Sequence, residues 1–324
     1  LTNGPRASSQ GVEIRGLSGS RVLQTIDGAR QNTGSGHRAT YFMDPELLKS
    51  IEVLRGPASS LWGSGALGGV VAQNTKSAQD FLAPNETFGG YFKQGYETNG
   101  SRTKTSGAIY GQQDSIDWLL NGSYTDSNNI KTGNDETLSN SSSNGSSGLV
   151  KFGWQADEAS RLELSARVNK INELVPSNPS AAASNSVPLV RRKTDDQNIT
   201  LDYSFNPANN PYLDTKMQVY WNSTDYDEDR ITKGQLDSTE YRTVGINLNN
   251  SSRLGNTLLT YGVDGFRDTI ETTRDDSGQV GQRPGNIDGE TTVWGAFTRA
   301  DIELTQTLNL DAGLRYDSFK NDSN

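Results

Sequence analysis

The 324 residues contain no cysteine and a single histidine. A sequence without cysteine offers no disulfide, thiol nucleophile or iron–sulfur cluster, and one histidine cannot build a zinc site made of histidines. Basic residues are also few, because 30 Lys and Arg stand against 39 Asp and Glu, which gives a formal net charge of −9. A nucleic-acid-binding surface needs a basic face. We therefore expect no nucleic-acid partner.

Long apolar runs are absent as well. No run approaches the roughly 18 residues that a transmembrane helix needs. Hydrophobic residues make up 32% of the sequence, below the roughly 45–50% (glycine included) of ordinary globular proteins. The 34 glycines, together with frequent Asn, Ser and Thr, favour strands and turns instead.

The first 82 residues predict a small α+β unit. Asp27-Gly28 is a strong turn dipeptide, and a helix is predicted to begin at Asp44, with Pro45 at its first position. The short strands expected around these signals are 12–16, 21–26, 51–55 and 70–75.

From about residue 87 onward, apolar and polar residues alternate strictly, as in half-buried strands. We count about eleven such segments of roughly ten residues or more, a length that suits tilted strands crossing a bilayer. Clear examples are 150–154, 162–168, 199–205, 217–221, 244–248 and 308–316.

The connections between these segments alternate in length. Short links are expected at 112–115, 156–160, 206–212, 249–256 and 305–308, and long polar links at 127–147, 174–193, 225–238 and 268–288. Short turns on one rim and long loops on the other are typical of outer-membrane barrels. A soluble sandwich or solenoid, with one face in a protein core, is the alternative for the alternating strands.

Three blocks, 12–17, 25–30 and 51–71, resemble the plug domain of TonB-dependent outer-membrane receptors. The resemblance implies a mainly β fold, a transmembrane antiparallel β-barrel of a 22-stranded family with an α+β plug in its lumen. It assigns residues 1–82 to the C-terminal part of the plug and 83–324 to the N-terminal half of the barrel, so we expect a fragment of a larger receptor. It also implies outer-membrane lipid and the TonB–ExbB–ExbD inner-membrane complex as partners.

Within that superfamily, 27–49, 63–71 and 75–82 are similar to haem and haemoglobin receptors. In those receptors a histidine at the outward apex of the plug binds haem iron and a barrel loop supplies the second ligand. The resemblance implies that His37 is the plug-side axial ligand and that the second ligand lies beyond Asn324. Gly34 and Gly36 would let the loop expose the imidazole with little steric hindrance. An ordinary exposed loop histidine is the alternative interpretation.

Charged residues of the plug blocks are also assigned by the resemblance. It implies that Arg15, Glu52 and Arg55 pair with acidic residues of the inner barrel wall and hold the plug in place. Surface ion pairs worth about 0–1 kcal/mol each are the alternative.

The sequence therefore predicts an energy-coupled receptor that imports haem, taken from haemoproteins such as haemoglobin, and no enzyme. Gly63–Gly68 matches a dinucleotide motif, but a strand follows it where that motif needs a helix. The acidic run 225–229 lacks EF-hand spacing. The other interpretations are a ferric-siderophore receptor on the same scaffold and a β-rich surface protein without transport.

Overall fold

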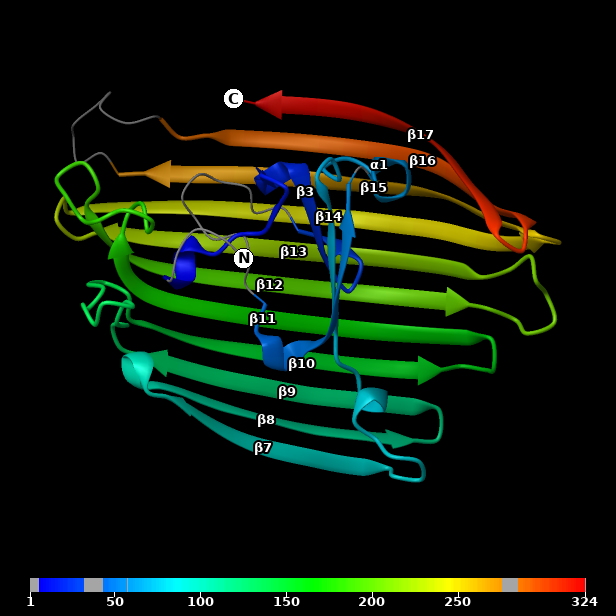
Figure 1. The fold of residues 1–324 in the computed structure, drawn as a ribbon, viewed down its shortest axis with the longest axis horizontal. Coiled ribbons are helices and arrows are strands. Elements are labelled where there is room, and N and C mark those ends of the chain that lie inside the picture. Colours follow the sequence, from blue (N-terminus) through cyan, green and yellow to red (C-terminus); the bar gives the residue numbers. More distant parts are fainter. Residues whose placement is uncertain (1–5, 32–42, 57, 276–284, 324) are drawn as a thin grey trace.

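Eleven strands form one antiparallel sheet in which each strand lies beside its neighbours in the sequence (Figure 1). The computed structural model describes residues 6–31, 43–56, 58–275 and 285–323. The strands are β7 Phe88–Glu97, β8 Arg102–Gln113, β9 Ile116–Ser127, β10 Ser143–Gln155, β11 Ser160–Pro176, β12 Leu189–Phe205, β13 Thr215–Arg230, β14 Gln235–Leu254, β15 Thr257–Arg274, β16 Asp288–Thr305 and β17 Leu308–Ser323. The prediction of about eleven long strands is confirmed.

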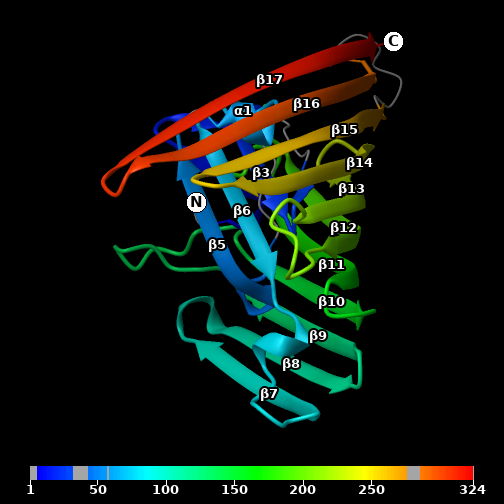
Figure 2. The same ribbon diagram turned by 90° about the vertical axis from the view of Figure 1, so that its right-hand side faces the viewer.

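The sheet is a curved wall, and the plug elements lie on its concave side (Figure 2). It is open in this chain, because β7 and β17 each pair with one neighbour only among the described strands. The expected fold, a mainly β barrel portion around a small plug, is confirmed.

The plug contains a four-stranded sheet in the order β4-β3-β6-β5 and a separate hairpin, β1-β2. Its strands are β1 Glu13–Ile14, β2 Leu17–Ser18, β3 Val22–Ile26, β4 Ala29–Arg30, β5 Leu48–Arg55 and β6 Gly69–Thr75. The helical turns of the chain are η1 Ala7–Ser9, η2 Gly19–Arg21, η3 Pro45–Leu47, α1 Ser59–Trp62, η4 Ala78–Asp80 and η5 Asn99–Ser101. In the described ranges no helix is long and apolar enough to cross a bilayer.

Two local predictions need correction. The helix expected from Asp44 is a single 3₁₀ turn, η3, because the chain becomes extended at Leu48, with ψ 135°, and enters β5. The long link expected at 225–238 is wrong: β13 and β14 continue to Arg230 and Gln235, so four residues connect them. Buried Tyr226 lies on the inner side there, so the alternation continues although the outward residues are polar.

The outer face of the sheet carries a band of exposed apolar side chains. Along β12, Ile199, Leu201 and Tyr203 are exposed, whereas the intervening Thr200 is fully buried on the inner side. The band continues across neighbouring strands through Leu120, Val150, Phe152, Trp154, Leu164, Met217, Val219, Val244, Leu248, Val263, Leu314 and Tyr316. An apolar outer band with a polar interior is the arrangement of a membrane-spanning barrel, and a soluble sandwich would bury this band.

Apolar packing joins the plug to the wall on the side of β8 and β9. Ile26, Met43 and Leu47 of the plug share one buried cluster with Leu119 and Leu149 of the barrel strands. Just after η4, the ring of Phe81 stacks on Tyr110 at a centroid distance of 4.8 Å. Aromatic pairs of this kind add about 0.5–1.5 kcal/mol beyond their buried area.

Candidate functional site

The candidate haem ligand His37 lies outside the described residues, but both ends of the segment that holds it are anchored on the barrel wall. On the N-terminal side, Asn222 of β13 donates a hydrogen bond to the carbonyl oxygen of Arg30. On the C-terminal side, Asp44 pairs with Lys104 of β8. The described residues on the two sides of 32–42 are therefore held by different strands, β13 and β8.

Asp44 connects the plug to two barrel strands. Its carboxylate accepts hydrogen bonds from Lys104 and from the hydroxyl of Ser123, and it also caps η3 through the N–H of Glu46 at 2.9 Å. Burial alone would raise the pKa of Asp44, but the hydrogen bonds from Lys104, Ser123 and Glu46 hold it below its usual value. The carboxylate is therefore ionised and paired at neutral pH.

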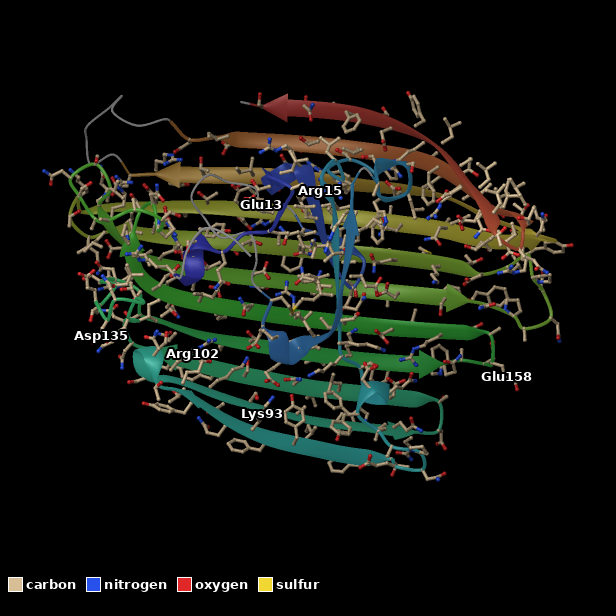
Figure 3. The ribbon with its side chains drawn as sticks, viewed as in Figure 1. Glu13, Arg15, Lys93, Arg102, Asp135 and Glu158 are labelled. Atoms are coloured by element: carbon tan, nitrogen blue, oxygen red, sulfur yellow. The ribbon has the colours of Figure 1, made fainter. Side chains whose placement is uncertain are left out.

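Two further plug carboxylates meet barrel lysines. Asp27 lies 3.3 Å from the ammonium of Lys151 on β10, whose side chain is only 7% exposed. Glu46 lies 2.8 Å from the ammonium of Lys93, the residue labelled on β7 in Figure 3. Asp27, Asp44 and Glu46 thus each pair with a lysine from a different barrel strand.

Lys151 is the centre of a larger network on the wall. It also contacts Glu163 at 3.2 Å, and Glu163 in turn contacts Arg161, which makes a bidentate pair with Asp117. The plug is therefore joined through Asp27 to a chain of alternating charges that spans three barrel strands.

Arg30 extends from β4 toward β15. Its guanidinium carbon lies 4.5 Å from the centre of the Phe266 ring, and its Nε is 3.9 Å from the carboxylate of Asp268. Its Nη1 donates to the carbonyl of Ser64 within the plug at 2.6 Å. The side chain of Arg30 thus contacts the wall through an aromatic ring and a carboxylate.

Arg15, Glu52 and Arg55 are all exposed in the structure. Arg15, labelled in Figure 3, occupies the tight turn between β1 and β2. Its φ is positive, at 53°. Glu52 accepts a hydrogen bond from Asn74 on the neighbouring plug strand at 3.2 Å. Within the described ranges these three residues make no ion pair with the wall, so their pairing stays a prediction.

A cavity of about 750 Å³ lies between the plug and strands β11 to β16. Asp27 and Arg30 line it from the plug, and Asp202, Tyr220 and Phe266 line it from the wall. Its volume lies within the range of small-molecule sites. The described residues contain no group of three or more metal-ligating side chains.

Sequence reasoning missed the residues that hold the plug in this structure. The sequence predicts a turn residue at Asp27 and a helix cap at Asp44, and both side chains also pair with lysines. The sequence did contain one signal. Lys151 is a charged residue at a position of β10 that faces the lumen, whereas the outward-facing residues around it are apolar. The partner of an inward lysine cannot be read from alternation.

The comparisons with known proteins agree with this architecture. The family described as "TonB-dependent Receptor Plug Domain" matches residues 1–70, and that described as "TonB dependent receptor-like, beta-barrel" matches residues 151–324, more than half of the chain. The chain belongs to the TonB-dependent receptors.

Among the relatives of this receptor chain is "Heme/hemopexin utilization protein C" of Haemophilus influenzae (strain 86-028NP), 36% identical over 367 residues that cover 100% of the chain and 51% of the relative. A "Hemin receptor" of Yersinia enterocolitica is 30% identical, covering 100% of the chain and 47% of that protein. The chain thus spans about half the length of the curated relatives it matches.

Solved structures show the same fold. The Serratia marcescens hemophore receptor HasR, in complex with its hemophore HasA and heme, aligns with a TM-score of 0.84 at 28% identity, over 95% of this chain and 46% of that one. The FrpB iron transporter of Neisseria meningitidis also aligns with a TM-score of 0.84, at 22% identity, over 99% of this chain and 56% of that one. The second likeness supports the fold alone.

Proposed function

We propose that this chain is part of a bacterial outer-membrane receptor that binds haem and imports it with energy from the TonB–ExbB–ExbD complex. The observation that carries the proposal is the 36% identity, over the whole chain, to a protein named for heme and hemopexin utilization. HasR, whose structure contains heme and a hemophore, adds support at 28% identity. The apolar outer band fits a protein embedded in the outer membrane, and the role is one of binding and transport, not catalysis.

We place the plug at residues 1–82 and the barrel portion at 83–324. The last helical turn on the concave side, η4, ends at Asp80, and the first strand of the wall begins at Phe88. Phe81 still packs on the wall, so the division falls in the short connection that follows it.

His37 is the residue we propose as the plug-side axial ligand of the haem iron. It is the only histidine of the 324 residues, and a neutral imidazole nitrogen is a common axial ligand of haem iron. The contacts of Arg30 and Asp44 with the wall support this role, because the described residues on both sides of His37 are held at the wall. The cargo is haem itself or haem delivered by a haemoprotein.

The test is a haem titration of the purified full-length receptor in detergent, followed by its Soret absorbance. We expect a shifted Soret band for the parent, a loss of tight binding in His37→Ala, and parent-like binding in Asn32→Ala, a polar control from the same stretch of sequence. A parent receptor that gives no Soret shift but binds a ferric siderophore would reject haem as cargo. A His37→Ala receptor with unchanged affinity and spectrum would reject His37 as ligand and leave the cargo standing.

A further inference from the structure

Arg6, just before η1, inserts its side chain between two connections of the barrel strands. Its Nε donates to the carbonyl oxygen of Asn140 at 2.8 Å and its Nη2 donates to that of Ser139 at 2.9 Å. Its Nη1 donates to the carbonyl oxygens of Pro179 at 2.5 Å and Ala181 at 3.5 Å. The residue is only 6% exposed.

The two connections belong to different hairpins of the wall. Residues 128–142 join β9 to β10, and residues 177–188 join β11 to β12. Both lie on the rim opposite the turns 114–115, 255–256 and 306–307. In outer-membrane barrels the extracellular rim is the one opposite such short turns. One guanidinium therefore bridges two neighbouring loops on the side from which cargo arrives.

Each loop presents its carbonyl oxygens in a locally fixed shape. In the first loop the side-chain oxygen of Asn129 accepts hydrogen bonds from the N–H groups of Ser141 and Ser142, at 2.8 and 3.0 Å. The second loop is closed at its base by a hydrogen bond from the N–H of Ser177 to the carbonyl of Pro188, at 2.8 Å. Arginine suits such a junction because its planar group carries five donors and no acceptor.

The segment that carries Arg6 is itself tied down. The hydroxyl of Ser9 donates to the carbonyl of Arg6 at 2.7 Å, and the N–H of Ser8 donates to the carboxylate of Glu173, near the end of β11, at 3.3 Å. Glu173 is buried and supplies a negative charge close to the guanidinium. Arg6 is thus held from the plug side and from the wall.

We propose that Arg6 is a strap by which the plug holds these two extracellular loops at a fixed separation, so that withdrawal of its side chain frees both loops together. All four acceptors are backbone carbonyls, so substitutions within the loops leave them in place. Arginine stays charged throughout the physiological range, and we infer that the strap responds to the position of the plug. This inference does not depend on the identity of the cargo.

The experiment measures the distance between the two loops in the full-length receptor. Spin labels are placed at Glu136→Cys and Ala183→Cys, both exposed, and these 324 residues offer no native cysteine to interfere. Pulsed electron paramagnetic resonance is expected to give one narrow distance distribution in the parent and a broad one in Arg6→Ala. Arg6→Lys, which cannot span all four carbonyls, is expected to give an intermediate width.

The matched control is Arg21→Ala, which removes an exposed plug arginine whose Nε donates locally to the carbonyl of Ser18. It is expected to leave the distribution narrow. Circular dichroism of each variant checks that the barrel is folded. A folded Arg6→Ala receptor with the parental distribution would overturn the strap, whereas failure of the Soret titration would reject only the haem proposal.

Discussion

Lys151 is a buried charged residue of the lumen whose charge is balanced by neighbouring carboxylates. Its ammonium lies 3.3 Å from Asp27 and 3.2 Å from Glu163, and its side chain is 7% exposed. Removing one partner of a buried ion pair leaves the other charge uncompensated and costs about 3–5 kcal/mol. We expect Lys151→Met to lower the unfolding temperature of the receptor in detergent clearly, because Asp27 then loses its cation and Glu163 keeps only Arg161.

The matched control for this prediction is Lys131→Met. Lys131 also pairs with an aspartate, Asp135, at 2.8 Å, but it is 57% exposed in a loop. Exposed pairs contribute about 0.2–1 kcal/mol, so the control is expected to unfold close to the parent. Equal shifts for the two variants would show that the Asp27–Lys151 contact does not stabilise the plug in the wall.

The contacts of Asp44 predict that the stability of the receptor depends on pH. Its pKa in the folded state lies below its ordinary value of 3.8 through hydrogen bonds that outweigh burial. A depressed carboxylate pKa adds stability that is present above the unfolded pKa and is lost as the pH falls through the folded pKa. We expect Asp44→Asn to be less stable than the parent at pH 7 and to lose less stability than the parent below about pH 4.

This second prediction is measured as the unfolding temperature across pH 7 to pH 2.5. Asp135→Asn is the control, because the Asp135 side chain is 81% exposed; its acid profile should follow the parent. If Asp44→Asn declined as steeply as the parent, the pairing with Lys104 would not be the source of the acid sensitivity.

At the residue scale the sequence indicated which side chains face inward but not what they touch. The inward position of Lys151 follows from strict alternation along 150–154. Its partner Asp27 is more than a hundred residues away in a tight turn, and no local pattern links the two. The resemblance directed attention to Arg15, Glu52 and Arg55, which are exposed, while Asp27 and Asp44 make the contacts.

At the scale of strands, glycines and aromatic rings face each other across the sheet. Gly245 on β14 lies directly opposite Tyr220 on β13, and Gly265 on β15 lies opposite Trp294 on β16. In both pairs the ring lies over the glycine, so that an added Cβ would overlap the ring atoms. Covering a strand glycine with a cross-strand ring is a known way of fixing register.

Gly245→Ala is therefore expected to push Tyr220 out of its buried position. Overpacking of this kind costs about 1–3 kcal/mol, which should appear as a lower unfolding temperature and a change in tyrosine absorbance. Gly122→Ala is the control, because the atom nearest to its added Cβ is the Ser147 carbonyl oxygen at 3.7 Å, an ordinary contact. A Gly245→Ala receptor as stable as the control would show that Tyr220 has room to move.

Element boundaries were the least predictable feature of the chain. The polar residues after 224 predict a loop, yet β13 and β14 continue there, and Tyr226 and Tyr241 pack against each other on the inner face. Whether the outward-facing residues are polar or apolar depends on whether water or lipid surrounds that part of the strand. Beyond the lipid the outward-facing residues are polar, so their composition resembles that of a loop. The pairing of the backbone continues regardless.

At the scale of the whole molecule, the order and number of the barrel strands followed from the sequence, because neighbouring strands of the wall pair in sequence order. The placement of the plug did not. It depends on contacts such as Phe81 on Tyr110 and Asp44 on Lys104, which join distant segments. The alternation of apolar and polar residues predicts which face of each strand points outward. Only the resemblance to TonB-dependent receptors predicts that a plug lies in the lumen.

The position of the apolar band predicts how the receptor sits in the bilayer. On β12 the exposed apolar residues run from Ile199 to Tyr203, next to the short turns, while the other end of the strand is polar outside. β14 has 20 residues, about twice the 9–11 that a tilted membrane strand needs. The strands therefore extend beyond the lipid on the side of the long loops.

Leu201→Lys and Leu236→Lys test this placement as a pair. Both leucines are exposed, at 42% and 64%, but Leu201 lies in the centre of the apolar band and Leu236 near the β13–β14 turn. A lysine on the lipid face costs about 2–4 kcal/mol at the bilayer midplane and about 0–1 kcal/mol near the interfaces. We expect Leu201→Lys to reduce the folded yield in lipid vesicles strongly and Leu236→Lys to leave it unchanged. The reverse order, or equal losses, would mean that the bilayer surrounds a different stretch of the strands.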